Sequence, residues 1–425
     1  MDHGTTLLFD LPGFRVVECR EDEHGQRHLV VMGEGDEHAC PGCGVLVGGK
    51  PYDLRESRVK DLPFGHRPLM VTWRKRRYRC AEAGCPRRIF TESSAQVPPR
   101  HRLTGRLRAK LEAAASTSAR SCADVALEYR VSDWSVHKAL LDRAIGLLDQ
   151  PHPVRRLGLD ETRTRSVRWV LDGAGWRRSD PWMTSFVDLD TGRPGGLLGL
   201  TPGRCGVAVE AWLAGQPEAW KAGIEIVALD PSAPFASAIR RALPHAVIVV
   251  DHWHLVRLAN AAVTEVRQRV AREQLGRRGR KTDHAWAHRG LLLRAGNTLS
   301  PKALARLKQV FAHDDPTNEI GAAWACKELL RQLLAARDRH TAAHRLFRFY
   351  QACATADMPE TTRLAMTIQT WWPHVERFLM TGVTNARTEG YNRVIKQLKR
   401  VGCGYRNQAN YQRRIVLHIA AKQAA

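Results

Sequence analysis

The hydrophobic pattern over the first hundred residues predicts short β-strands. Apolar runs separated by polar turns occur at Thr6–Phe9, Phe14–Val17 and His28–Met32. Further along, Leu69–Trp73 and the basic run Arg74–Arg79 alternate well enough to predict a hairpin. Because these runs are short, we expect a small β unit whose own hydrophobic core is limited.

The pattern turns helical over residues 104–150. It predicts a short helix over Ser121–Arg130, a turn at Val131–Asp133 that supplies a cap, and a second helix over Trp134–Leu141. This arrangement is typical of a helix-turn-helix, whose second helix enters the major groove of DNA. A helical hairpin with no role in DNA binding would give the same pattern, so both interpretations stay open at this point.

From about residue 155, apolar strands alternate with helices, which predicts a mixed β-sheet with helices on its faces. Three of the predicted strands end in an acid, and they are Arg156–Asp160, Ile224–Asp230 and Ala246–Asp251. The other predicted elements are the strands Val167–Leu171 and Trp182–Asp188 and the helices Val207–Leu213, Pro234–Leu243 and His252–Asn260.

Residues 261 to about 380 are rich in Ala, Leu, Arg and Trp at helical spacing, with a basic break at Gly276–Lys281. This pattern predicts an all-α insertion. Its tryptophans are interpreted as packing residues and not as platforms for stacking bases, and they are Trp286, Trp324, Trp371 and Trp372.

The stretch Asn385–Asn407 predicts a helix with one broad polar and basic face. Glu389 is the only acid in this stretch, and the residues expected to face a core are Val394, Ile395 and Leu398. A lone carboxylate at the head of a basic helix can hold a divalent cation, while the helix follows a phosphate backbone. The alternative is a solvated amphipathic helix with a favourable acid at its N-terminus.

The charge of the whole chain favours a polyanionic partner. The 425 residues contain 66 Lys and Arg against 43 Asp and Glu, a net charge of +23 that is spread along the sequence. Nucleic acid is the simplest such partner. A membrane is the weaker choice because no apolar run approaches the roughly 18 residues needed to span a bilayer. The first residues also lack the pattern of a signal peptide.

Four of the ten cysteines form two closely spaced pairs, Cys40 with Cys43 and Cys80 with Cys85. Two such pairs joined by a segment rich in strands fit a four-thiolate zinc ribbon in a reducing compartment. Zinc would supply the folding free energy that so small a core cannot. A thioredoxin-like redox pair lacks the expected βαβ surroundings, and unrelated free cysteines are the remaining alternative.

The acids at the strand ends predict a metal site. Asp160 and Asp230 can lie side by side at the carboxyl edge of the sheet, where sites form in such folds. Like charges this close repel strongly unless a cation lies between them. Two divalent ions would remove the repulsion and provide a site for displacement at phosphorus. Taken singly, each Asp could instead cap the following turn or helix.

The order of these features resembles the ISL-three (ISL3) family of bacterial insertion-sequence transposases. The resemblance covers nearly the whole chain and rests on the segments CPGCG, RYRCAEAGC, GLDETR, ALDPSAPF, IVVDHWHLVRLAN and NARTEGYNRVIKQLKRVGCGYRN. It implies an α/β multidomain protein in which a zinc ribbon and a helix-turn-helix precede a ribonuclease-H-like catalytic domain with an all-α insertion.

The resemblance also implies an Asp-Asp-Glu site that holds Mg²⁺ or Mn²⁺, and on this chain its residues are Asp160, Asp230 and Glu389. Asp251 and His254 match an accessory Asp-x-x-His element. Asp251 is the alternative to Asp230 as the second metal ligand. We favour Asp230 because a proline-containing turn and a helix follow its strand, as they follow the second acid of the family.

The implied function is metal-dependent cleavage and transfer of DNA strands at terminal inverted repeats, in the bacterial cytoplasm at the nucleoid. The implied partners are the double-stranded DNA of those repeats, the target DNA, and at least one further copy of this chain. Residues expected to read or hold DNA are Trp134, Ser135, His137, Lys138, Arg393, Lys396, Lys399, Arg400 and Arg406. Alternatives are a catalytically silent DNA-binding regulator derived from a transposase and another ribonuclease-H-like nuclease.

These expectations divide the chain into five parts. They are a β and zinc-binding part at 1–100, a helix-turn-helix part at 101–150, a first catalytic part at 151–260, an all-helical insertion at 261–380 and a final catalytic helix with Glu389 at 381–425.

Overall fold

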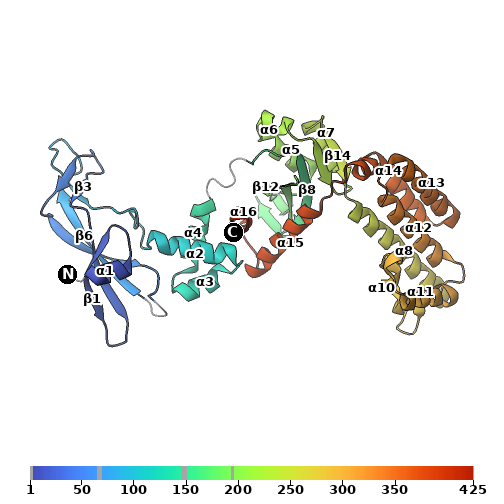
Figure 1. Ribbon diagram of the computed structural model, residues 1–425, viewed down its shortest axis with the longest axis horizontal. Helices are drawn as coiled ribbons and strands as arrows, with labels where there is room; N and C mark the ends of the chain where they lie inside the picture. The colour runs from blue at the N-terminus through green and yellow to red at the C-terminus, as the bar shows by residue number, and fades with distance from the viewer. Residues whose placement is uncertain (1–2, 65–68, 145–150, 193–195, 425) are drawn as a thin grey trace. The chain divides into compact units, whose positions relative to one another are not determined.

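The computed structural model describes residues 3–64, 69–144, 151–192 and 196–424. The chain forms two compact units. The first unit comprises Met1–Asp149 together with Gln397–Ala425, and the second comprises Gln150–Lys396. Figure 1 shows the chain and labels many of its helices and strands.

The first unit begins with a helix and a five-stranded sheet. The elements are α1 (His3–Phe9), β1 (Phe14–Glu21), β2 (Arg27–Gly33), β5 (Asp53–Lys60), β6 (Leu69–Arg79) and β7 (Ile89–Thr91). Strands β1, β2, β6 and β5 are neighbours in that order, and β7 pairs with β6. The small strands β3 (Glu37–Ala39) and β4 (Leu46–Gly48) form a separate antiparallel pair. The core of this sheet contains Phe14, Val31, Val71 and Trp73.

Two predictions for this sheet are wrong. Thr6–Phe9 lies in helix α1 and not in a strand, because a short apolar run does not by itself distinguish the two. Leu69–Trp73 and Arg74–Arg79 are not two arms of a hairpin but one strand, β6. No turn residue separates Trp73 from Arg74, so the strand continues, and its antiparallel partner is β5, upstream in the sequence.

A cluster of helices completes the first unit. They are α2 (Gly105–Thr117), α3 (Cys122–Tyr129), α4 (Asp133–Ala144) and α16 (Gln408–Ala424). The predicted short helix, turn and second helix are therefore confirmed, and the last six residues of the predicted helical stretch 104–150 lie outside the described residues. The Ser121 hydroxyl accepts a hydrogen bond from the Asp124 N–H at 3.0 Å, and the Ser132 hydroxyl accepts one from the Ser135 N–H at 3.2 Å. Both bonds cap helix N-termini.

Helix α16 falls within the predicted part 381–425, but it lies against α2 and α4 of the first unit. Its side chains Ile415, Leu417 and Ile419 are buried, and Leu417 belongs to the same core as the helices α2 to α4. The Arg414 guanidinium donates to the Arg120 carbonyl at 2.7 Å. These contacts join residues about 300 positions apart, which local periodicity cannot predict.

The second unit is built on the predicted mixed sheet. Its strands are β8 (Arg156–Arg163), β11 (Trp182–Asp188), β12 (Leu197–Pro202), β13 (Ile226–Leu229) and β14 (Val247–Val250). Their spatial order is β12-β11-β8-β13-β14. Strand β11 is antiparallel to β8 and β12, whereas β13 is parallel to β8 and β14. The helices beside this sheet are α5 (Gly206–Ala214), α6 (Glu218–Ala222) and α7 (Ala233–Ala242).

The first strand of this sheet is longer than predicted. Strand β8 continues to Arg163, so Asp160 lies within the strand and not at its end. Apolar residues stop at Leu159, but the backbone ladder does not, since Asp160 and Glu161 pair with Ser185 and Thr184 of β11. The predicted strand Val167–Leu171 begins later, as β9 (Trp169–Asp172), and pairs with β10 (Gly175–Arg178).

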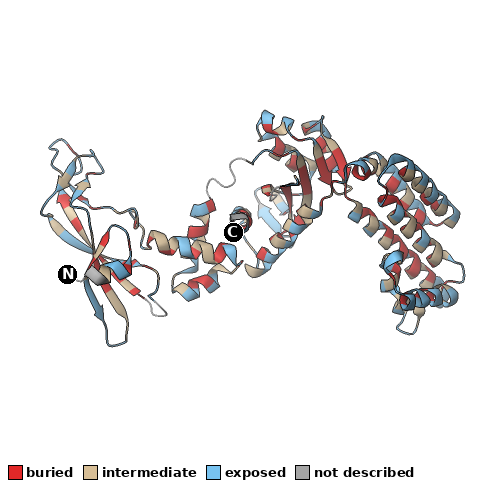
Figure 2. Ribbon diagram, in the orientation of Figure 1, coloured by how far each residue is buried: buried red, intermediate tan, exposed pale blue. Residues whose placement is uncertain are grey.

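Helices follow the sheet. They are α8 (His252–Leu275), α9 (His284–Ala287), α10 (Arg289–Leu293), the 3₁₀ turn η1 (Gly296–Thr298), α11 (Pro301–His313), α12 (Glu319–Leu334), α13 (Arg339–Ala356), α14 (Pro359–Thr381) and α15 (Ala386–Val401). The sheet and α12 to α14 share one hydrophobic core, whose buried strands and helix faces are seen in Figure 2. Trp324, Trp371 and Trp372 pack against cores, as predicted. None of the described helices has the length and apolar character needed to cross a membrane.

Candidate active site

Asp160 lies at the centre of the polar residues on the second unit's sheet. Its two carboxylate oxygens accept hydrogen bonds from the Asn392 amide at 2.6 Å and from the Glu161 N–H at 2.7 Å. Burial, together with the nearby charges of Asp230 and Glu161, raises the pKa of Asp160 to about 7. Such a site disfavours a bare carboxylate and favours one that is neutralised by a proton or a cation.

Asp230 follows directly after β13, where the predicted strand-end acid was expected. One of its oxygens lies 2.7 Å from Nε2 of His254 in α8, and its other oxygen, Oδ1, is buried without a hydrogen-bond partner. Burial lowers the pKa of His254 and the hydrogen bond to Asp230 raises it, with a net upward shift. A buried carboxylate oxygen without a partner is available to coordinate a cation.

Asp251, His254 and Glu389 form a further group, whose ligand atoms all lie within 4.8 Å of one another. Asp251 is buried and caps α8, with its Oδ1 accepting a hydrogen bond from the Trp253 N–H at 3.3 Å. Among the described residues, the sets that meet this distance criterion do not include the predicted trio Asp160, Asp230 and Glu389. Because His254 contacts Asp230 and also belongs to this group, it links the strand acids to Glu389.

The N-terminal half of α15 is held tightly against β8. The Asn385 side chain donates to the Leu159 carbonyl at 2.8 Å, and Arg387 donates to the carbonyls of Asp188 and Asp190 at 3.0 and 2.8 Å. Gly158 makes this approach possible, because a Cβ there would lie 2.8 Å from the Asn385 side-chain oxygen. This packing positions Glu389 and Asn392 beside the strand that carries Asp160.

Asn392, Glu161 and Arg204 are site residues that sequence reasoning missed. Asn392 falls within the helix predicted over Asn385–Asn407, where the pattern indicates no role for it, yet it is 3% exposed and its side-chain amide donates to Asp160. Asn392 lies three residues after Glu389, and residues at this spacing share a helix face. This spacing could have identified it as a site residue. Burial and then the charge of Asp230 raise the pKa of Glu161, and the opposing charge of Arg204 lowers it. No sequence pattern indicated Arg204.

The four predicted zinc ligands come together in the first unit. The sulfur atoms of Cys40 and Cys85 lie 3.9 Å apart and those of Cys43 and Cys80 lie 3.5 Å apart. Four thiolates at about 2.3 Å around a tetrahedral zinc would be separated by about 3.8 Å, so the geometry fits a structural zinc ion. The Gly42 N–H is the main cause that lowers the pKa of Cys40 to about 7, which favours the thiolate that binds metal.

A basic cleft of about 1100 Å³ lies between the sheet and the helices of the first unit. Trp134, Ser135 and Lys138 of α4 line it, whereas His137 does not, although its ring lies 5.5 Å from that of Trp134. The acids in the lining are Glu56 and Asp142. The basic residues outnumber them and are Arg55, Arg58, Lys60, Lys75, Arg100, Arg102, Arg108 and Lys138.

The predicted basic residues of the last segment point largely to solvent. Arg393, Lys396, Arg400 and Arg406 are exposed, and Lys399 is partly buried. Ile395 and Leu398 are buried, as predicted for the core-facing side of the helix. These charges are therefore available to a polyanion.

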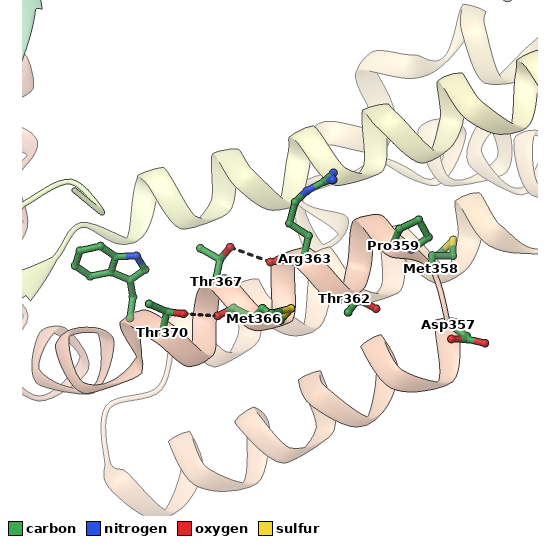
Figure 3. A pocket seen from close by; sticks show the side chains of 9 residues that line it. Asp357, Met358, Pro359, Thr362, Arg363, Met366, Thr367 and Thr370 are labelled. Atoms are coloured by element: carbon green, nitrogen blue, oxygen red, sulfur yellow. Dashed lines mark hydrogen bonds between the residues drawn. The ribbon is translucent and has the colours of Figure 1, made fainter. Parts of the chain in front are cut away.

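A separate cavity of about 690 Å³ lies along α14 and is shown in Figure 3. The hydroxyls of Thr367 and Thr370 donate to carbonyls of their own helix, and Arg363 pairs with Glu265. Its lining combines apolar and hydroxyl side chains with Asp357 and Arg363. This lining offers no cluster of metal ligands, so the carboxylates around Asp160 remain the candidate active site.

The chain belongs to a known class of DNA-processing enzyme. A family model described as "Transposase", for the DDE transposases of the ISL3 family, matches residues 170–415, more than half of the chain. The chain therefore belongs to this family of catalytic enzymes. Membership of the family implies DNA transposition and the use of a divalent metal. The match includes Asp230, Asp251, His254 and Glu389 and begins after Asp160.

Two further similarities agree with this membership. Residues 36–85 match a model described as the zinc-finger of transposase IS204/IS1001/IS1096/IS1165, which contains all four clustered cysteines. The chain is also 22% identical over 398 residues to the "Transposase for insertion sequence element IS1001" of Bordetella parapertussis, covering 93% of this chain and 92% of that protein. The expected membership of the ISL3 family is thus confirmed.

Proposed function

We propose that this enzyme cleaves DNA at the terminal inverted repeats of an insertion sequence and transfers the strands to a target, in the bacterial cytoplasm at the nucleoid. The proposal is supported by the contacts that surround these acids. His254 contacts Asp230 and lies in one group with Glu389, and Asn392, on the same helix as Glu389, donates a hydrogen bond to Asp160. The strand order, with one antiparallel half and one parallel half, supports a ribonuclease-H-like catalytic domain.

The proposed metal ligands are Asp160, Asp230 and Glu389, with Mg²⁺ or Mn²⁺ as the ion. A bound divalent ion at such a site lowers the pKa of a water or of a terminal hydroxyl and stabilises the leaving oxygen. Asn392 fixes the Asp160 carboxylate, and His254 orients the Asp230 carboxylate. Asp251 caps α8 and so holds His254 in place. Carboxylate oxygens are the ligands that Mg²⁺ prefers.

The proposed DNA-reading part is the helix-turn-helix formed by α3 and α4. Trp134, Ser135 and Lys138 line a cleft whose other walls are basic, which suits a duplex held by its phosphates while α4 contacts base edges. Arg393, Lys396, Lys399, Arg400 and Arg406 would bind the phosphate backbone. Two DNA ends are joined in transposition, so we propose that at least a dimer forms on DNA.

The five-part division is retained as a proposal with one change. The helix α16 is assigned to the DNA-binding helices, because its core is shared with α2 to α4. The catalytic domain then ends within α15, after Glu389.

Cleavage specificity tests this function. The full-length protein with Mg²⁺ is given DNA from the end of the inverted repeat that bounds its own reading frame, and the same DNA with the repeat scrambled. We expect cleavage at the repeat end alone. Equal cleavage of both DNAs would indicate a general nuclease, and binding to the repeat without cleavage would indicate a catalytically silent regulator.

A further inference from the structure

The hairpin β9–β10 carries an exposed aromatic surface that the proposed catalytic residues do not use. Trp169, Leu171 and Trp176 are 62%, 62% and 68% exposed. In the antiparallel register Trp176 pairs with Leu171, and Arg178 pairs with Trp169. Because side chains of directly paired residues lie on the same side of a sheet, these four side chains share one face.

This hairpin is a direct extension of the strand that carries Asp160. Strand β8 ends at Arg163, three residues beyond Asp160, which is about 10 Å along a strand. The Thr164 N–H then donates to the Pro181 carbonyl at 2.8 Å, and the Ser179 N–H donates to the Arg168 carbonyl at 2.7 Å. These bonds keep the two chain segments paired from the sheet to the base of the hairpin.

Among the described elements, none makes extensive contacts with the hairpin β9–β10 beyond its own two strands, so nothing covers the aromatic face. On the opposite face, Val170 is also 44% exposed. Large apolar side chains that gather in one exposed patch often mark a binding site. The occupant is indicated by charge: the segment from Arg163 to Asp180 contains five arginines and two aspartates. An apolar surface flanked by arginines fits nucleic acid better than it fits a second apolar protein surface.

We propose that Trp169 and Trp176 stack on unpaired bases of the DNA strand that is processed at Asp160, while Arg178 on the same face holds its phosphates. Aromatic side chains accept any unpaired base on their faces, and arginine adds charge to the backbone. The inference rests on the proposed function, because the strand that must be unpaired is the one to be cut.

Binding without cleavage tests this inference. All proteins carry Asp160→Ala so that the DNA stays intact, and the probes are a short duplex and the same duplex with a single-stranded oligo-dT tail. We expect tighter binding of the tailed probe, by about tenfold for stacking of a base. The double variant Trp169→Ala/Trp176→Ala should lose this preference and keep its affinity for the plain duplex. Phe347→Ala, at a 66% exposed aromatic residue elsewhere in the same unit, should keep the preference.

A second measurement covers the case in which the double variant folds poorly. A 2-aminopurine in the tail should lose fluorescence when the protein with intact tryptophans binds it, because stacking quenches that base. No tail preference and no quenching with the intact tryptophans would overturn the proposal. So would a double variant that binds both probes normally but forms smaller oligomers in sedimentation, since a second copy of the chain would then be the occupant. Failure of repeat-specific cleavage would leave these binding results unchanged, so the two proposals fail separately.

Discussion

Replacing Asp160 with Asn should stabilise the metal-free second unit above neutral pH. The Asp160 carboxylate is held where burial and the charges of Asp230 and Glu161 raise its pKa to about 7. The folded protein therefore holds a proton that the unfolded chain has released, and its stability falls as the pH rises from about 4 to about 7. An amide has no charge to lose, so Asp160→Asn removes this penalty.

The magnitude follows from the two pKa values. The interval between about 7 and the ordinary aspartate pKa near 3.9 corresponds to about 4 kcal/mol once the group is ionised. An amide cannot accept from both the Asn392 amide and the Glu161 N–H, and one lost hydrogen bond costs about 1 kcal/mol. The expected net gain is therefore about 2–3 kcal/mol at pH 8 and close to zero at pH 4.

Chemical unfolding of the full chain, followed at pH 8 and pH 4 with and without Mg²⁺, measures this difference. Added Mg²⁺ should stabilise the wild type at pH 8 and have little effect on Asp160→Asn, because the ion replaces the missing counter-charge. Glu218→Gln is the matched control. That side chain is 90% exposed, so its neutralisation should leave the free energy of unfolding unchanged at both pH values. Equal or lower stability of Asp160→Asn at pH 8, or the same gain from Mg²⁺ in both proteins, would refute the reasoning.

Three further changes test separate parts of the structure. Gly158→Ala should push α15 away from β8, at a cost of about 1–3 kcal/mol for overpacking, and should reduce cleavage while zinc content measured by atomic absorption stays normal. Cys40→Ser should abolish the zinc that copurifies with the wild type, and a wild type without zinc would contradict the ribbon. Asp230→Asn should abolish Mg²⁺-dependent cleavage, whereas Asp251→Asn should retain part of it because Asn caps a helix as well as Asp does; the reverse order would make Asp251 the second ligand.

Elements whose pattern is local could be predicted from the sequence. Trp182–Asp188 is observed as β11 with the predicted bounds, and the two short helices around Val131 are confirmed. The cysteine pairs were also recognisable, because ligand spacing in a ribbon is a short-range property.

The parts that could not be predicted depend on contacts distant in sequence. Asp160 was expected at a strand end because apolar residues stop there, but pairing with β11 continues the strand. The role of Asn392 depends on its contact with Asp160, more than 200 positions away. The docking of α16 depends on α2 and α4 in the same way. Hydrophobic periodicity describes one element at a time and contains no information about such pairs.

The most direct test of the proposed catalytic site compares the wild type with Asp160→Ala and Glu389→Ala on DNA that contains the terminal repeat, in Mg²⁺. Binding to the repeat is measured on the same samples, so that a loss of cleavage is distinguished from a loss of DNA binding. We predict that both variants bind the repeat as the wild type does and cut it at least a hundredfold more slowly, on the order of what loss of a metal ligand or of its support costs. Cleavage at the wild-type rate by either variant would contradict the assignment of these carboxylates.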